Sequence, residues 1–388
     1  AGKHTHPMTK QPMRYLGLLY LILIGWLWWH EQQHHHGTLQ PAYAQSEPGP
    51  TVVTHHETIP NPVFGSLWRM AEQCKAVQTP CAWEANSTWT TGIVPDSDSR
   101  VIIDGVVQIN QANAIAHAVG IYPGGELRFN PAANTQLHSG DIVVFAGGVL
   151  TIGDVAQPIG ADYTAHVVLR DLPFENDPKQ HLRGIVVVDG AFSMHGRALS
   201  ATFIRIATEP RQGATTIHLT TSALAAGWRV GDEVVLPKSS QCPIATTQGT
   251  CPDETEDRTI ATIADDGLSL TLTAPLAFDH PGARDNQGQL DFLPHLLNKS
   301  RNVIIRSENP TGVRGHILLH ARSVVDLRYA RLQDLGRTDI RNLGDENQKG
   351  RYPLHAHHLI GPVATPANGY QYTLVGNVID FGTANETQ

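Results

Sequence analysis

The stretch SRNVIIRSENPTGVRGHILLHARSVVDLRYARLQDLG, residues 300–336, decides the fold class. It consists of short runs of Val, Ile and Leu, separated by a few Gly, Pro or polar residues. Runs of this kind are typical of β-strands joined by tight turns. Because the runs follow one another at short intervals, they favour a solenoid of stacked strands over an ordinary β-sandwich.

The end of this stretch recurs further along the chain. LRYARLQDLG (327–336) is echoed 46 positions later by TLVGNVIDFG (373–382), and 46 is two steps of 23. A step of that size suits one turn of a parallel β-helix. Such coils bury one interior stack of apolar residues and leave their outer faces free for a binding groove.

Glycine-containing turns also close short β-prone runs in the first part of the chain. Examples are IYPGGELRF (121–129), VVFAGGVLTIG (143–153) and GWRVGDEVVL (227–236). Glycine permits a positive φ or a close backbone approach, which the corners of a stacked β-coil require. β-Sandwiches use the same turns, so this region by itself leaves both architectures open.

The composition is that of a folded protein with many turns. Among 388 residues, 41% are hydrophobic and 16% are charged, and there are 35 Gly and 25 Pro. The four cysteines, Cys74, Cys81, Cys242 and Cys251, lie in two close pairs, so two local disulfides are the simplest pairing in an oxidising compartment. Metal ligation by these thiols is the alternative, although neither spacing is that of a zinc knuckle.

The N-terminal segment, residues 1–45, predicts export. Arg14 precedes an apolar run (15–29), and Ala-Tyr-Ala at 42–44 supplies a cleavage pattern. An uncleaved signal anchor is the alternative, and only in that case do we expect contact with a membrane. We therefore expect a secreted or cell-surface protein in which residues 46–61 form a linker to the fold.

The order of the motifs resembles a known family. PDSDSRVIIDG (95–105), PGGELRF (123–129), GAFSMHG (190–196) and GRYPLHAHH (350–358) follow one another along the chain. This order resembles the eight-glycine domain and β-helix of the family that contains the cell-migration-inducing hyaluronan-binding protein, a transmembrane hyaluronidase and bacterial counterparts. The chain looks like a bacterial-type member, and the resemblance covers roughly residues 62–388.

The resemblance implies an all-β chain with three parts. These are an eight-glycine domain over 62–240, a connecting region with a disulfide loop over 241–298, and coils of a right-handed, pectate-lyase-like parallel β-helix over 299–388. Family members continue for several more coils beyond the position matched by NVIDFG (377–382), so we expect a β-helix that is incomplete at its C-terminus. The resemblance also implies binding or cleavage of a hyaluronan-like polysaccharide, with calcium required by some members.

Charge supports an acidic polysaccharide as the partner. Residues 299–351 hold eleven Lys or Arg against six Asp or Glu, a net charge of +5, whereas the whole chain carries −8. A local positive potential attracts a polyanion even when the net charge is negative. The alternative is that these arginines pair with neighbouring carboxylates. Export and the scarcity of interleaved aromatic residues argue against nucleic acid.

Histidines gather in two short stretches. Three of them lie in RYPLHAHH (351–358), and two more flank the apolar centre of the strand HILLH. Because side chains alternate along a strand, burial of Ile317 and Leu319 would place His316 and His320 outside on one face. By the same logic, we expect His355 and His357 to be exposed and their neighbours Leu354 and Ala356 to be buried.

Two kinds of polysaccharide cleavage could use these residues. Hydrolysis needs two carboxyl groups, for which Asp334 and Asp339 are the candidates. Elimination from a uronate needs a base, here a histidine such as His355 or His357 or else an arginine, and a cation such as Arg351 to hold the substrate carboxylate. The sequence therefore favours an enzyme, a polysaccharide hydrolase or lyase, without deciding between the two.

Other residues complete the predicted groove, and other readings remain open. The candidates for substrate binding are His316, His320, Arg328, Arg337 and Tyr352. The histidines could instead be hydrogen-bonded in turns, or the pair His355 and His357 could share a divalent ion with His316 or an Asp. A non-catalytic adhesion module that uses the same groove is the alternative function. No Asp/Asn/Gly-rich calcium loop is present in the sequence.

Overall fold

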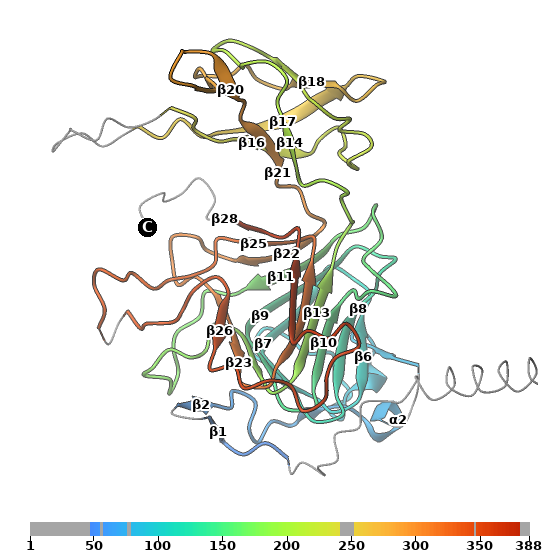
Figure 1. Ribbon diagram of the computed structural model, residues 1–388. Helices are drawn as coiled ribbons and strands as arrows, with labels where there is room; N and C mark the ends of the chain where they lie inside the picture. Colours follow the sequence, from blue (N-terminus) through green and yellow to red (C-terminus); the bar gives the residue numbers. More distant parts are fainter. Residues whose placement is uncertain (1–46, 55–56, 76–78, 241–251, 345–346, 381–388) are drawn as a thin grey trace, which may run out of the picture. The chain divides into compact units, whose positions relative to one another are not determined.

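The computed structural model describes residues 47–54, 57–75, 79–240, 252–344 and 347–380. These residues are almost entirely β-structure, with one four-residue helix, α2 (Glu72–Lys75), and one 3-10 turn, η1 (Asn86–Thr88). Most strands lie in two large, parallel sheets (Figure 1). For the described residues, the prediction of an all-β fold is confirmed.

The first large sheet consists of seven parallel strands in the order β27-β24-β13-β10-β8-β6-β4. Their bounds are β4 (Cys81–Ala82), β6 (Val106–Ile109), β8 (Glu126–Phe129), β10 (Val149–Ile152), β13 (Ala191–His195), β24 (Val324–Arg328) and β27 (Tyr372–Val375). Every strand lies beside one that is more than ten residues away in sequence, as parallel pairing requires a crossover connection.

The second large sheet has two arms that share the long strands β7 (Ala114–Ile121) and β9 (Thr135–Val144). The first half of β9 pairs with β11, whereas its second half pairs with β12. One arm contains β3 (Trp68–Arg69), β5 (Arg100–Ile103), β12 (Gly184–Val188), β23 (His316–His320) and β26 (His355–His357). The other arm contains β11 (Ala165–Leu169), β22 (Val303–Ser307), β25 (Ala330–Gln333) and β28 (Val378–Asp380).

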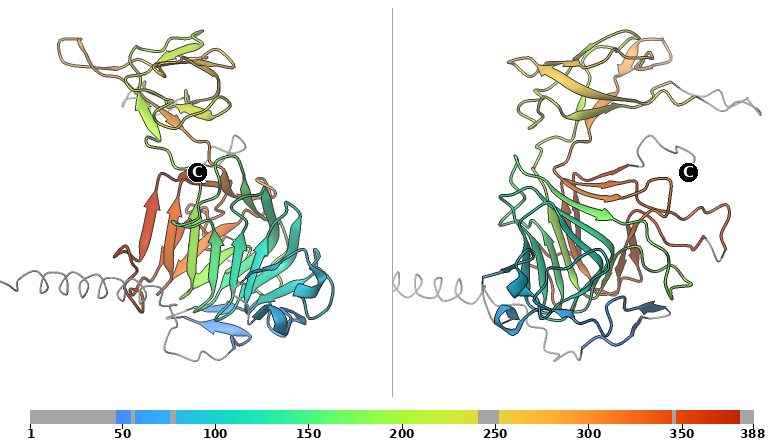
Figure 2. Two further views of the ribbon diagram at one scale, coloured as in Figure 1. Left: turned by 90° about the vertical axis from the view of Figure 1, so that its right-hand side faces the viewer. Right: turned by 180° about the vertical axis from the view of Figure 1, so that it is seen from behind.

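From β7 onward, the chain passes through the two arms and then the first sheet, and it repeats this order in successive layers. Figure 2 shows the strands of these parallel sheets side by side from two further directions. Each layer places its apolar residues beside those of the layer before.

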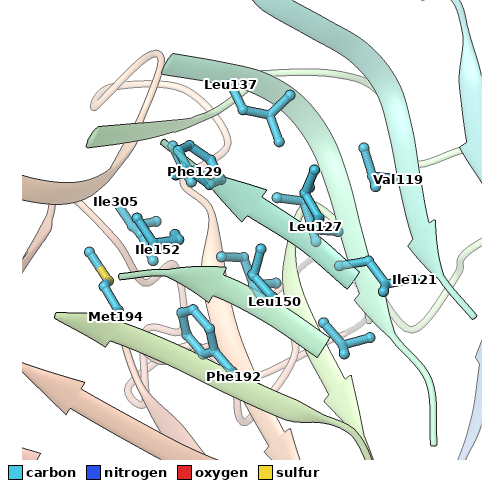
Figure 3. Close-up of a cluster of buried hydrophobic side chains, with 14 of the residues drawn as sticks. Val119, Ile121, Leu127, Phe129, Leu137, Leu150, Ile152, Phe192, Met194 and Ile305 are labelled. Carbon is cyan, nitrogen blue, oxygen red and sulfur yellow. The ribbon is translucent and has the colours of Figure 1, made fainter. Parts of the chain in front are cut away.

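The interior is a continuous apolar stack that runs from layer to layer. In the first sheet, Val107 pairs with Leu127, Leu127 with Leu150, Leu150 with Phe192, and Phe192 with Val325. These side chains are at most 1% exposed. Figure 3 shows part of this stack, in which Leu127, Leu150 and Phe192 follow one another across β8, β10 and β13. Burial of Ile317 and Leu319 in the same cluster confirms that part of the alternation predicted for β23.

The outer face of the arm that contains β12 and β23 is also buried. Two short strands, β1 (Thr51–Val53) and β2 (Thr58–Pro60), form an antiparallel hairpin, and Ile59 and Val63 pack in an apolar cluster with Leu318. Residues 46–61 were predicted to be a linker, but the described part of this segment is folded. Ile59 is fully buried and Val52 is partly buried against the sheet, and a solvated linker does not bury apolar surface in this way.

A second part of the chain is antiparallel and has its own apolar cluster, built around Trp228. Six strands take the order β14-β21-β16-β17-β18-β15, and β19 and β20 form a separate hairpin. The bounds are β14 (Phe203–Arg205), β15 (Thr216–His218), β16 (Glu233–Leu236), β17 (Glu256–Ile263), β18 (Ser269–Leu272), β19 (Ala283–Arg284), β20 (Leu290–Phe292) and β21 (His295–Asn298). A boundary at 240 therefore differs from the structure, because β16 and β17 pair across it. The parallel layers begin well before 299, at β3 and β5.

The spacing of the layers also differs from the sequence-based expectation. β24 pairs directly with β27, and Leu327 lies opposite Leu374, so the echoed stretches are neighbours and not two turns apart. The step of 23 occurs elsewhere, between Glu126 in β8 and Val149 in β10. The last step is longer because a polar loop separates β25 from β26.

Cys74 and Cys81 form a disulfide, as predicted. The second predicted pair, Cys242 and Cys251, and the predicted export segment 1–45 lie outside the described residues. Within the described ranges, no helix has the length and apolar character needed to cross a membrane.

The glycines at the layer corners provide a test of the stacking. A Cβ on Gly125 or Gly148 would collide with the backbone carbonyl of Ile103 or Ile121 in the preceding layer. We expect Gly125→Ala and Gly148→Ala each to lower the free energy of unfolding by about 1–3 kcal/mol or more, because backbone cannot move aside as a side chain can. Urea unfolding measures the loss. Gly344→Ala is the control, since a Cβ there meets nothing within 4 Å, and its effect should stay within about 0.5 kcal/mol. Equal effects at all three positions would contradict the close stacking.

Candidate functional site

The predicted histidine stretch lies at a pocket of about 570 Å³ on the outer side of β23 and β26. The lining is polar and rich in cationic side chains and imidazoles. It consists of Glu57, Thr58, Lys179, His181, Leu318, Gln348, Lys349, Gly350, Arg351, Tyr352, His355 and His357. Residues from the N-terminal hairpin, from the segment before β12 and from the segment before β26 therefore meet in one place.

The register of two neighbouring strands brings the histidines together. Leu318 lies opposite His355, and His320 lies opposite His357. The ring centroids of His355 and His357 are 4.9 Å apart, and those of His320 and His357 are 5.3 Å apart. His355 and His357 thus share one face, as the alternation predicts. Ala356 points to the other side, and it is exposed where the prediction expected burial.

The prediction that His316 and His320 are exposed is wrong. Their exposed fractions are 0% and 1%, because the N-terminal hairpin and arginine side chains cover the outer face of β23. His316 Nδ1 lies 3.2 Å from Arg337 Nη1 and 3.3 Å from the carbonyl oxygen of Arg183. Burial, followed by the charges of Arg337 and Arg351, lowers the pKa of His316 well below its ordinary value of 6.5. His316 is thus a neutral, interior side chain at neutral pH.

His357 also stays neutral at neutral pH. Burial lowers its pKa to about 4, and the neighbouring imidazoles act in the same direction, although the charge of Glu57 opposes them. Its Nε2 lies 3.6 Å from Glu57 Oε2. The Nδ1 atom of His355 lies 2.8 Å from the carbonyl oxygen of Gly350 in the preceding loop.

Two predicted arginines have structural contacts with the backbone. Arg351 donates to the carbonyl oxygens of Gln180 (2.6 Å), Lys179 (2.6 Å) and Lys349 (3.1 Å). Arg337 donates to four carbonyl oxygens, including those of Gln180 and Leu182 at 2.7 and 2.8 Å. Burial lowers the pKa of Arg337 to about 9. These guanidinium groups fix the segment before β12 against the outer face of the sheet.

The predicted carboxylate pair does not line the pocket. Asp334 is 5% exposed, and its backbone bonds to Asp380 and Ser307 in the neighbouring strands. Asp339 lies in the loop after β25, where Arg341 and then Asn342 bind its carboxylate and lower its pKa to about 2. The structure thus brings neither carboxyl group to the histidines.

The remaining predicted residues divide between the pocket and another face. Tyr352 lines the pocket, with its ring centroid 5.1 Å from that of His355. Arg328 belongs to β24 of the first sheet, and its guanidinium pairs with Asp326. It lies outside the pocket lining.

Most cations of the basic segment 299–351 are paired with carboxylates or bonded to backbone carbonyls. The first of these arrangements is the alternative hypothesis for the basic segment, that its arginines pair with neighbouring carboxylates. Arg331 pairs with Asp380 and Glu233, and Lys299 pairs with Asp257. The exceptions concern the pocket. Within the described ranges, no ion pair or hydrogen bond engages the ammonium group of Lys349, or that of Lys179 on the opposite segment. Both side chains are exposed at the pocket.

A larger pocket, of about 930 Å³, lies in the antiparallel part of the chain. Its lining is mainly apolar and aromatic, and Arg205 lies over the ring of Phe292, with 4.3 Å between the guanidinium carbon and the ring centroid. His295 is the one imidazole among its described lining residues, and no carboxylate accompanies it there. The smaller pocket has more ionisable side chains in its lining, including histidines, lysines, an arginine and a carboxylate, so it is the candidate site.

Comparison with known protein families identifies a domain in the part of the chain that forms the first parallel layers. Residues 88–207 match the G8 domain family. A G8 domain is present in this chain. The matched residues hold strands β5 to β14, so the G8 domain comprises a series of parallel layers and the first antiparallel strand.

Known proteins are similar to large parts of this chain. Mouse fibrocystin-L is 30% identical over 204 residues, which is 52% of this chain and 4% of the relative. A G8 domain-containing protein of Dictyostelium discoideum is 25% identical over 331 residues, or 77% of this chain and 25% of the relative. The chain thus spans a quarter or less of the length of these two relatives. The second alignment extends well beyond the G8 domain.

The stability of the buried cluster should depend on pH through His316. Its folded-state pKa lies below the unfolded value, so the unfolded chain binds more protons and the free energy of unfolding falls as pH drops below about 6.5. We expect His316→Asn to reduce this slope by at most about 1.4 kcal/mol per pH unit, the limit for one proton. Urea unfolding at several pH values between 7 and 4 measures it. An unchanged slope would contradict a neutral, buried His316.

Proposed function

We propose that this chain is an extracellular module, secreted or held at the cell surface, that binds an acidic polysaccharide of the hyaluronan type in the pocket beside β26. The supporting observation is the pair of exposed lysines, Lys179 and Lys349, whose ammonium groups are unengaged among the described residues. They face a pocket in which Glu57 is the one carboxylate of the described lining. The Cys74–Cys81 disulfide fits an oxidising compartment.

The fold supports a long polymer as the ligand. We infer that the parallel layers are coils of a right-handed parallel β-helix of the pectate-lyase-like kind, because the chain passes through three parallel faces in a constant order. Successive coils present equivalent positions at regular spacing. A repeating sugar chain can then contact the loops of more than one coil.

The buried Arg351 adds to the attraction without contacting the ligand. Its hydrogen-bond donors are used by backbone carbonyls, but its positive charge remains and lies next to the pocket. Partly buried charges are less screened than those in bulk water. The exposed lysines would make the direct contacts with uronate carboxylates, and the field of Arg351 would strengthen them.

Tyr352 supplies a second element of recognition. Its half-buried ring lies at the pocket with one edge toward His355. An aromatic side chain offers a flat apolar surface and a polar hydroxyl group at little cost in conformational entropy. Sugar rings have apolar faces that pack on such a surface, so the pocket combines cationic and aromatic contacts.

Binding is better supported than cleavage. Hydrolysis requires two carboxyl groups on opposite sides of the bond, and the described lining contains Glu57 as its one carboxylate. An elimination that uses Arg351 as carboxylate clamp would first have to break its backbone hydrogen bonds. The imidazole of His357 is neutral and can accept a proton, but a pKa of about 4 makes it a weak base at neutral pH, so elimination is also poorly supported.

The pocket does not fit calcium. Calcium takes six to eight oxygen ligands, whereas the donors here are imidazoles and a single carboxylate. We therefore assign calcium no role in ligand binding at this site.

Loss of the two lysines should weaken polysaccharide binding. We expect the double variant Lys179→Gln/Lys349→Gln to bind a hyaluronan oligosaccharide roughly 2- to 30-fold more weakly, since exposed charge contacts contribute about 0.2–1 kcal/mol each. Isothermal titration calorimetry on the full chain measures the affinity. The wild-type affinity should fall with added salt, and the variant should depend less on salt.

Lys238→Gln is the control for loss of a lysine outside the site, because Lys238 follows β16 in the antiparallel part and does not line this pocket. Chondroitin and pectate test the substrate class, and size-exclusion chromatography with and without calcium shows whether the polymer is shortened. Shortened chains with unsaturated ends would show elimination. Equal affinity of the pocket variant and the control would overturn the proposed site, and absence of polyanion binding would favour a protein-contacting adhesion module.

A further inference from the structure

Three potential metal ligands from distant parts of the sequence meet at the inner edge of the pocket. They are Glu57 from the N-terminal hairpin, His320 at the end of β23 and His357 at the end of β26. One donor atom from each, an imidazole nitrogen or a carboxylate oxygen, lies within 4.8 Å of those of the other two. Among the described residues, this is the one cluster of three or more His, Cys, Asp or Glu side chains with such spacing.

The fold holds these groups in place. The parallel register sets His320 opposite His357, and neighbouring strands lie about 4.8 Å apart. The hairpin that ends at Pro60 is anchored by the buried Ile59, and this anchor places Glu57 over the two imidazoles. The three ligands are far apart in the sequence, so they come together only in the folded chain.

We propose that Glu57, His320 and His357 form a binding site for a divalent transition-metal ion of the zinc type. Two imidazoles and one carboxylate are a ligand set that zinc uses in proteins, and the set is too poor in oxygen for calcium or magnesium. The proposal is independent of polysaccharide binding.

The spacing is compatible with closure around an ion. Ligand atoms about 2.0–2.1 Å from a tetrahedral zinc ion lie about 3.3–3.4 Å from one another. Glu57 Oε2 and His357 Nε2 are already 3.6 Å apart. Small side-chain rotations would bring the third donor in. A rotation is enough, because the strands that carry the histidines are already paired.

The site is closed on one side and open on the other. His320 is 1% exposed, whereas the side chains of Glu57 and His357 are 23% and 20% exposed and line the pocket. A metal ion there would keep a position toward the pocket for water or a ligand, as catalytic zinc sites do. His358 could instead supply the fourth ligand. Its backbone φ is +48°, and its ring centroid lies 4.0 Å from that of His357.

The electrostatic setting is consistent with a metal ion. Imidazoles bind metals only in their neutral form, and burial keeps His357 neutral at neutral pH. Glu57 supplies a negative charge among groups that are neutral or positive. The competing interpretation is a simple contact between His357 and Glu57 without metal, and a metal titration separates the two.

The test is a titration of the full, metal-free chain with Zn²⁺, and with Co²⁺ as a spectroscopic probe. The chain has 21 histidines, so the decisive quantity is the difference between wild type and variants and not the absolute stoichiometry. We expect Glu57→Gln and His357→Gln each to weaken one Zn²⁺ site at least tenfold, and to remove the corresponding visible absorption of bound Co²⁺. Zn²⁺ should raise the melting temperature of wild type more than that of either variant.

His166→Gln in β11 is the control, since His166 is a half-buried strand histidine outside the cluster and should leave this site unchanged. Circular dichroism of the metal-free variants shows whether they fold. Glu57→Gln preserves shape, so it keeps the test valid if His357→Gln unfolds. Zn²⁺ binding and stabilisation that are equal in wild type and Glu57→Gln would overturn the proposal. No polysaccharide is present, so this result is separate from the lysine experiment.

Discussion

The in-register stacking of parallel strands is the constraint on which the rest of the structure depends. Each layer pairs residue by residue with the previous one, so a buried Leu or Phe in one strand requires an apolar residue at the same position in the next. Ladders such as Leu127, Leu150 and Phe192 satisfy this requirement and exclude water from the interior. The same register aligns polar residues on the outer faces, and there it sets His320 beside His357.

The outer face is partly covered, and this cover creates the pocket. The N-terminal hairpin buries Leu318 on the outer side of the sheet, while Arg337 and Arg351 bind the carbonyl oxygens of the segment before β12. A guanidinium group offers five donors in a fixed plane, so one side chain can satisfy several carbonyl groups that would otherwise be buried without partners. These contacts hold the cationic segments on either side of the histidines.

Much of the fold could be predicted from sequence because it follows from local patterns. These patterns are the short Val/Ile/Leu runs, the glycines at layer corners and the alternation in HILLH, and each depends only on residues close in sequence. The alternation in HILLH correctly placed Ile317 and Leu319 in the core. Which outer faces are covered depends on distant segments. Nothing near His316 or His320 in sequence indicates the hairpin that buries them, so their exposure was predicted wrongly.

The candidate site shows the same limit. His355, His357 and Tyr352 lie in one stretch and were recognised from their density. Glu57, Lys179 and His181 complete the pocket from other parts of the chain, and no sequence signal linked them to it. The echo of 46 positions identified two similar strands, but only the register shows that they are adjacent layers.

Hydrogen–deuterium exchange with and without a hyaluronan oligosaccharide tests most directly whether the polysaccharide occupies this pocket. We expect the ligand to slow exchange in residues 177–183 and 347–357, which carry the lysines and histidines of the lining. Exchange in residues 281–297, at the apolar pocket of the antiparallel part, should stay unchanged. Slower exchange at 281–297 alone, with none around Lys179 and Lys349, would contradict it.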